Sequence, residues 1–168
     1  MPTVTEILET MDYGPAPEAA GEVLAWLQTH AQFGHYIDGT FTAPGETFTS
    51  ANPTTGDSLA EVTQGSDADV TKAVAAARAA APGWAALPGH ERAKWLYAIA
   101  RHLQKRERFL AVLETLDNGK PIRESRDIDL PLAIRHFYHH AGWAEVAQDE
   151  FPALAPHGVV GAVIPWNY

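Results

Sequence analysis

The sequence closes on GVVGAVIPWNY, residues Gly158 to Tyr168. Residues 158–164 form a continuous apolar run with proline near each end, too short for a core helix. Such a run is typical of a strand that is buried on both faces in a parallel sheet. Because ligands of open parallel sheets bind beyond the carboxyl ends of the strands, residues 165–168 are candidates for a functional site.

Asn167 is the residue of this segment with the clearest chemical potential. Its neutral amide carries two N–H donors, which can stabilise negative charge that develops on a carbonyl oxygen. A purely structural reading competes with this one, in which Asn167 caps a turn and Trp166 packs on the sheet. The residues of this segment leave both readings open.

Upstream of this segment, the apolar residues recur mostly at helical spacing. Small side chains such as Ala73 and Ala77 line one narrow face, which predicts close packing against a neighbour. One expected helix covers residues 18–30, and a second runs from Ser66 to just before Pro82. The helical pattern resumes after Pro88 and continues until Gly119. The last expected helix runs from Leu130 to near Gly142.

Short β elements are expected between the first two helices. Asp38-Gly39 is the dipeptide best suited to a two-residue hairpin turn between residues 35–37 and 40–42. Residues 52–56, Asn-Pro-Thr-Thr-Gly, predict a further turn, and a strand is expected over 58–62. The sequence therefore predicts an α/β fold with a small hairpin near its start and a buried parallel strand at its end.

The composition excludes several functions. The 168 residues carry 12 Lys and Arg against 21 Asp and Glu, a net charge of −9, so nucleic acid and anionic membranes are poor partners. No run approaches the roughly 18 apolar residues that span a bilayer, and the first ten residues do not resemble a signal peptide, so we expect a cytoplasmic protein. There is no cysteine, and hence no thiol nucleophile.

The chain resembles the NAD(P)-dependent aldehyde dehydrogenases over about residues 35–168. Members of that family commonly carry a strand leading into Pro-Trp-Asn and an aromatic residue, as Ile164-Pro165-Trp166-Asn167-Tyr168 does here. Also similar are the motifs Asn-Pro-Thr-Thr-Gly at 52–56, Trp84 with Glu-Arg-Ala at 91–93, and Leu-Glu-Thr-Leu-Asp-Asn-Gly-Lys-Pro at 113–121.

The resemblance implies a role for each residue of the closing motif. Asn167 would hold the oxyanion of a cysteine thiohemiacetal while an aldehyde is oxidised to a carboxylic acid. Ile164, Pro165 and Trp166 would line the cleft for NAD or NADP, and Tyr168 would contact the aldehyde substrate. The catalytic cysteine and the general-base glutamate of the family lie downstream of this motif. We therefore expect the isolated chain to be inactive and to bind no cofactor, since residues 158–161 also lack a G-x-G-x-x-G fingerprint.

The resemblance also predicts domains and partners. Residues 1–34 would form a helical N-terminal extension similar to the family 16 branch, and residues 35–168 an incomplete, Rossmann-like cofactor-binding domain without its catalytic domain. The expected partners are the remainder of the dehydrogenase chain and further copies in a homo-oligomer, such as a dimer. Residues 144–157 are shorter than the hairpin of most relatives, which places the usual subunit contacts in doubt.

Two alternatives remain. Some family 16 relatives have lost the catalytic cysteine, so the parent protein would instead be a non-catalytic scaffold or interaction protein. Separately, His136 and His140 lie four residues apart on a predicted helix, with His139 beside His140. We expect surface histidines and no metal site here, because zinc sites normally have three or four convergent ligands.

Overall fold

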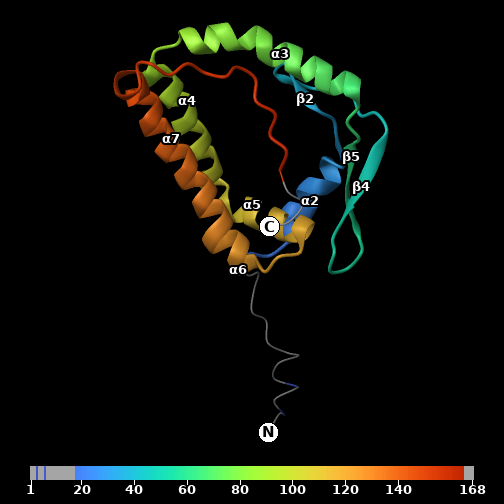
Figure 1. Cartoon of the computed structure of the whole chain (residues 1–168). Coiled ribbons are helices and arrows are strands. Elements are labelled where there is room, and N and C mark those ends of the chain that lie inside the picture. Colours follow the sequence, from blue (N-terminus) through green and yellow to red (C-terminus); the bar gives the residue numbers. More distant parts are fainter. Residues whose placement is uncertain (1–2, 4–5, 7–17, 165–168) are drawn as a thin grey trace.

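The computed structural model describes residue 3, residue 6 and residues 18–164. Residues 151–164 run from the end of α7 beneath α3 and then down between α4 and the strands (Figure 1). The elements are α2 (Gly21–Thr29), β1 (Gln32–Phe33), β2 (Tyr36–Ile37), β3 (Thr40–Phe41), β4 (Thr47–Ala51), β5 (Ser58–Thr63), α3 (Asp67–Ala86), α4 (Gly89–Lys105), α5 (Glu107–Asn118), α6 (Ile122–Glu124), the π-helical turn η1 (Ser125–Asp129) and α7 (Leu130–Glu150).

The β2–β3 hairpin confirms the turn predicted at Asp38-Gly39. Both turn residues have positive φ angles, 52° and 77°, which is the geometry of the turn that best follows the twist of a two-stranded hairpin. Tyr36 pairs with Phe41 and Ile37 with Thr40.

A second, three-stranded sheet has the order β1-β5-β4, with β1 parallel and β4 antiparallel to β5. The predicted turn at 52–56 connects β4 to β5. In it, the Asn52 carbonyl accepts a 2.7 Å hydrogen bond from the Gly56 N–H, and the Asn52 side chain accepts one of 2.9 Å from the Thr54 N–H. The predicted strand at 58–62 is confirmed as β5.

Helix α3 begins as predicted, but it ends later and packs differently. Ser66 and Asp69 form a capping box, with hydrogen bonds in both directions. The helix continues through Pro82 to Ala86, because the sequence on both sides of the proline is rich in alanine, the strongest helix former. No residue of α3 is buried. The expected close packing of its small side chains is therefore wrong for the part of the chain that the structure describes.

The core lies where α2, β5 and α5 meet. It is formed by Val23, Leu27, Ala60 and Val112, which are at most 7% exposed. Trp26, Phe33 and Phe109 pack around it, with the Trp26 and Phe109 rings edge to face at 5.5 Å. The boundary proposed at residue 34 remains a prediction; helix α2 on its N-terminal side contributes two residues to this core.

Helices α4 and α7 lie side by side as an antiparallel pair (Figure 1). Three of the residues buried on them are alanines (93, 100 and 141), which allow the two backbones to approach closely. Helix α7 continues to Glu150, past its predicted end near Gly142. A glycine ends a helix when it adopts positive φ, and Gly142 does not.

The buried parallel strand predicted over residues 158–164 does not form. These residues belong to no strand, and Val160, Val163 and Ile164 are 74%, 98% and 82% exposed. A strand needs neighbours for its backbone N–H and C=O groups, and none of the strands among residues 18–164 pairs with this segment. The α/β class and the hairpin are confirmed, and the terminal strand is corrected to an exposed segment without regular secondary structure.

Candidate functional site

Of the predicted site residues, only Ile164 lies within the described part of the chain. Its side chain is 82% exposed. Pro165, Trp166, Asn167 and Tyr168 lie outside the described residues. Their proposed roles therefore stay predictions.

The structure brings together two of the motifs that carry the family resemblance. The hydroxyl of Ser50, at the end of β4, donates a hydrogen bond to the carboxylate of Asp117 in the last turn of α5. Two residues on, Gly119 has a φ of 83°, and a Cβ built on it would lie 2.6 Å from Cγ of Pro53. Only glycine combines this backbone conformation with so close an approach.

Lys120 continues this junction with an ion-pair network. Its side chain is 12% exposed, and its ammonium group lies 2.7 Å from the Asp129 carboxylate and 3.3 Å from that of Glu114. The hydrogen bond to Asp129, with a further one to Glu114, raises the pKa of Lys120 against the opposing effect of burial. The network ties the end of α5 to η1 and the start of α7.

A second contact supports the same corner. The hydroxyls of Thr115 and of fully buried Ser125 are 3.0 Å apart. Sequence reasoning missed these contacts, although they involve the Leu-Glu-Thr-Leu-Asp-Asn-Gly-Lys-Pro motif. The only indication in the sequence was that the family-like motifs at 52–56 and 113–121 occur in one chain. Their spacing does not show that they are in contact.

An apolar pocket of about 420 Å³ opens beside this junction. Its volume lies in the range of small-molecule sites. Ser50, Glu114 and Asp117 supply its polar groups, and the Ser50 hydroxyl among them donates to the Asp117 carboxylate. Its apolar lining is formed by Trp26, Leu27, Phe33, Leu59, Ala60, Val62, Leu103, Leu110, Leu113 and Leu130.

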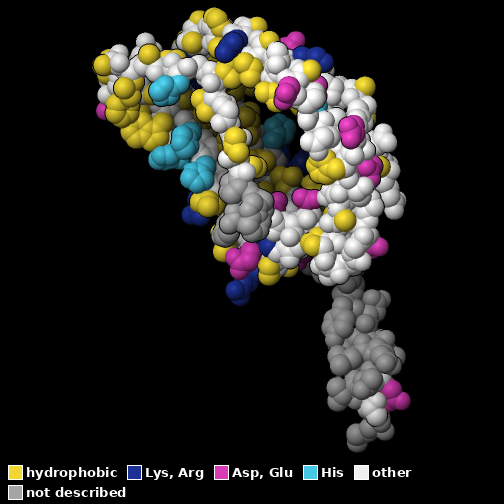
Figure 2. All heavy atoms as spheres, turned by 45° about the vertical axis from the view of Figure 1, so that its right-hand side comes forward, with side chains coloured by type: hydrophobic (Ala, Val, Ile, Leu, Met, Phe, Trp, Pro, Cys, Tyr) yellow, Lys and Arg dark blue, Asp and Glu magenta, His cyan; other side chains and the backbone are white. Residues whose placement is uncertain are grey.

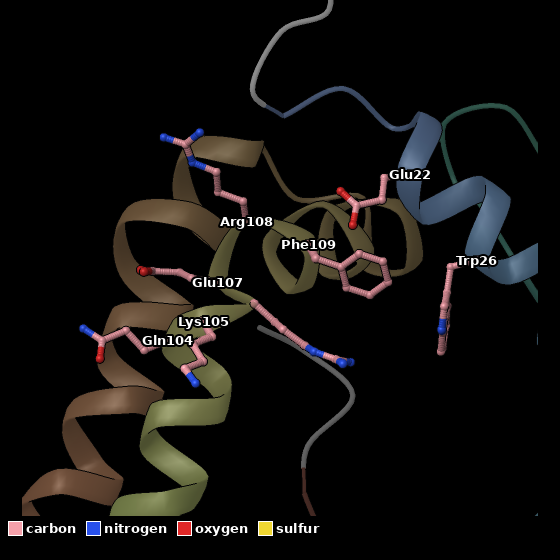
Figure 3. A pocket seen from close by; sticks show the side chains of 8 residues that line it. Glu22, Trp26, Gln104, Lys105, Glu107, Arg108 and Phe109 are labelled. Carbon is pink, nitrogen blue, oxygen red and sulfur yellow. The ribbon is translucent and has the colours of Figure 1, made fainter.

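A larger pocket, of about 610 Å³, lies between α2 and the corner from α4 to α5. Figure 3 shows Glu22, Trp26 and Phe109 around one space, while the side chains of Gln104 and Glu107 point away from it. Those two polar side chains therefore do not contribute to the space around Trp26 and Phe109.

Helix α7 displays its histidines on the surface. His136, His139 and His140 are all exposed, and no group of three metal-ligating side chains converges among the described residues. No helix in the described residues is long and apolar enough to cross a bilayer.

Comparison with known proteins gives a consistent result. The model of the aldehyde dehydrogenase family matches residues 41–168. An acetaldehyde dehydrogenase of Pseudomonas aeruginosa is 36% identical over 165 residues, and a fluoroacetaldehyde dehydrogenase of Streptantibioticus cattleyicolor is 38% identical over 165 residues; each match covers 91% of this chain.

Solved structures agree with these sequence matches. The HpcC protein of Thermus thermophilus superposes with a TM-score of 0.72 at 30% identity, over 82% of this chain and 28% of that one. An aldehyde dehydrogenase of Bacillus cereus in complex with NAD⁺ gives 0.68 at 36% identity, over 73% of this chain and 25% of that one.

The chain spans 32% of the length of each of the two curated relatives. The family match includes the two motifs that meet at Gly119 and extends through Asn167. The chain therefore belongs to the aldehyde dehydrogenase family.

Proposed function

We propose that this chain is the N-terminal part of an NAD(P)-dependent aldehyde dehydrogenase, which oxidises an aldehyde to a carboxylic acid through a cysteine thiohemiacetal. The observation that carries the proposal is the family match over residues 41–168. It is supported by relatives that are named as dehydrogenases of acetaldehyde and fluoroacetaldehyde.

In this proposal Asn167 acts on the reacting carbonyl. Its side-chain N–H donates a hydrogen bond to the oxygen that becomes negatively charged when the thiolate adds to the aldehyde. A donor held in place before the reaction stabilises that charge without reorganisation, which lowers the barrier. Tyr168 would contact the aldehyde, so its aromatic ring would bear on substrate choice.

NAD or NADP, when bound to the parent protein, accepts the hydride from the substrate. Ile164, Pro165 and Trp166 would line the cleft for the nicotinamide half. Ile164 fits this role, because its exposed side chain is available to a partner surface. The described residues contain no G-x-G-x-x-G loop between a strand and a helix, so we propose that the 168 residues alone hold no cofactor.

The remainder of the dehydrogenase chain is the first partner that we propose, and further copies in a homo-oligomer are the second. The exposed side chains of Val160, Val163 and Ile164 support the first, because large apolar side chains gain free energy when another protein surface covers them. Light scattering tests it: the 168-residue chain alone should self-associate, and a monodisperse monomer would contradict the proposal.

The test of catalysis uses the full-length parent protein. We expect reduction of NAD⁺ or NADP⁺ with acetaldehyde, and we expect Asn167→Ala to lower kcat by about 10²- to 10³-fold, the usual cost of one oxyanion donor. Asn118→Ala, at the exposed end of α5, is the matched control and should keep the wild-type rate. The proposal fails if the parent does not turn over aldehydes, as a scaffold protein would not, or if Asn167→Ala behaves like the control.

A further inference from the structure

Three histidines lie within five residues on α7. His136, His139 and His140 occupy positions i, i+3 and i+4, so their side chains share one side of the helix. The ring centroids of His136 and His140 are 6.1 Å apart, and those of His139 and His140 are 5.2 Å apart. All three side chains are exposed. In Figure 2 histidine side chains gather on one surface of the molecule, beside hydrophobic ones.

The ring of His140 is oriented by its own helix. Its Nδ1 lies 2.7 Å from the carbonyl oxygen of His136. A carbonyl only accepts hydrogen bonds, so Nδ1 carries the proton, and the lone pair of the neutral ring is on Nε2. Histidines that bind metals are held in the same way, with one ring nitrogen donating to a backbone carbonyl and the other facing the ion.

His139 is engaged differently. Its Nε2 lies 3.0 Å from Nε1 of Trp143, and indole N–H groups only donate. The Nε2 lone pair of His139 therefore accepts this hydrogen bond, and its ring stands at 83° to that of His140. His136 and His140 are left as the pair with nitrogen lone pairs available to a shared ligand.

We propose that His136 and His140 form a two-imidazole site for a divalent transition metal ion at the surface of α7. A metal bound by imidazole nitrogens lies about 2.0–2.1 Å from each, a geometry that histidines four residues apart on a helix reach with small rotamer changes. The net charge of −9 favours cations near the protein.

The site has a defined chemical character. No third protein ligand converges on it among the described residues, so water completes the coordination and the metal exchanges freely. Neutral imidazole suits Cu²⁺, Ni²⁺ and Zn²⁺, and Cu²⁺ binds most tightly of the three. The sequence favoured surface histidines over a metal site at this pair; the ring orientations, which the sequence does not contain, are the reason for proposing this weaker site.

The test is a calorimetric titration of the full chain without a His tag, using CuCl₂ and ZnCl₂ separately. We expect His136→Ala and His140→Ala each to weaken the tightest binding event by at least about tenfold, because even an outer partner of a metal ligand contributes 10- to 100-fold. His139→Ala is the matched control and should leave that affinity unchanged, and Cu²⁺ should bind more tightly than Zn²⁺.

Two results would overturn the proposal. One is wild-type protein that shows no saturable binding of either metal. The other is a loss of affinity in His139→Ala equal to that in the two ligand variants. Far-ultraviolet circular dichroism of each variant confirms that α7 is intact, and the imidazole proton resonances of His136 and His140 should shift on addition of Zn²⁺ in the wild type.

Discussion

The Ser50 hydroxyl donates to the Asp117 carboxylate, joining β4 to the end of α5 across 67 residues of sequence. Together with the contact between Pro53 and Gly119, this hydrogen bond holds one motif of the family against another. The junction borders the 420 Å³ apolar pocket, to which both Ser50 and Asp117 contribute. It therefore links the small sheet to the helical part of the chain.

Removal of either partner of this hydrogen bond should lower the free energy of unfolding. We expect Ser50→Ala and Asp117→Ala each to lower the free energy of unfolding by about 1 kcal/mol. The double variant should lose less than the sum of the two single losses. Urea denaturation measures all three. Ser58→Ala, an exposed serine on β5, is the control and should change little. Additive losses would show that the two side chains do not interact.

Gly119→Ala should be more destabilising than Gly56→Ala. Both glycines have similar positive φ angles, 83° and 78°, so alanine meets the same backbone strain of about 1–2 kcal/mol at each. A Cβ at Gly56 contacts nothing within 4 Å, whereas one at Gly119 meets Pro53. We expect about 1–3 kcal/mol of additional loss at Gly119 from overpacking. Equal thermal shifts for the two variants would contradict the close approach.

Lys120→Met should destabilise the chain at neutral pH and less at high pH. Because the folded state raises the pKa of Lys120, the stabilisation is complete below the ordinary lysine value of about 10.4 and is lost as the pH rises through the folded-state value. The difference in urea midpoint between wild type and variant should be constant from about pH 7 to 9. It should shrink once the pH exceeds the ordinary lysine pKa. The side chain of Lys72 is 70% exposed. The urea midpoint of Lys72→Met should therefore be almost the same as that of the wild type at both neutral and high pH.

The stabilisation that the capping box gives to α3 should be lost at acid pH. The hydrogen bond from the Ser66 hydroxyl, together with one from its backbone, lowers the pKa of Asp69. Its stabilisation is therefore complete above the ordinary aspartate value of about 3.9 and is lost as the pH falls through the lower folded-state value. Asp69→Asn should accelerate amide hydrogen exchange in residues 67–71 at pH 7. Asp67→Asn keeps both capping-box partners and should have a smaller effect, and equal acceleration would argue against the box.

Several local elements were predictable because their causes are local. The turn at Asp38-Gly39, the start of α3 at Ser66 and the end of α5 at Gly119 each depend on residues within a few positions in the chain. The ends of α3 and α7 were not predictable in this way. Pro82 and Gly142 usually end helices, but the alanine-rich sequence continues the helix past Pro82, and Gly142 keeps a helical conformation.

The sequence by itself determined the family, the lack of cysteine within these 168 residues and the hairpin, because motifs, composition and turn chemistry are properties of neighbouring residues. Tertiary structure alone decided that Asp117 meets Ser50, that Lys120 is paired with Asp129, and that residues 158–164 are exposed. The first of these outcomes depends on which surfaces meet across 67 residues of chain, and the second on how the chain turns between α5 and α7. An apolar strand-like segment forms a strand only where neighbouring strands satisfy its backbone, and no strand in the described part of the chain does so.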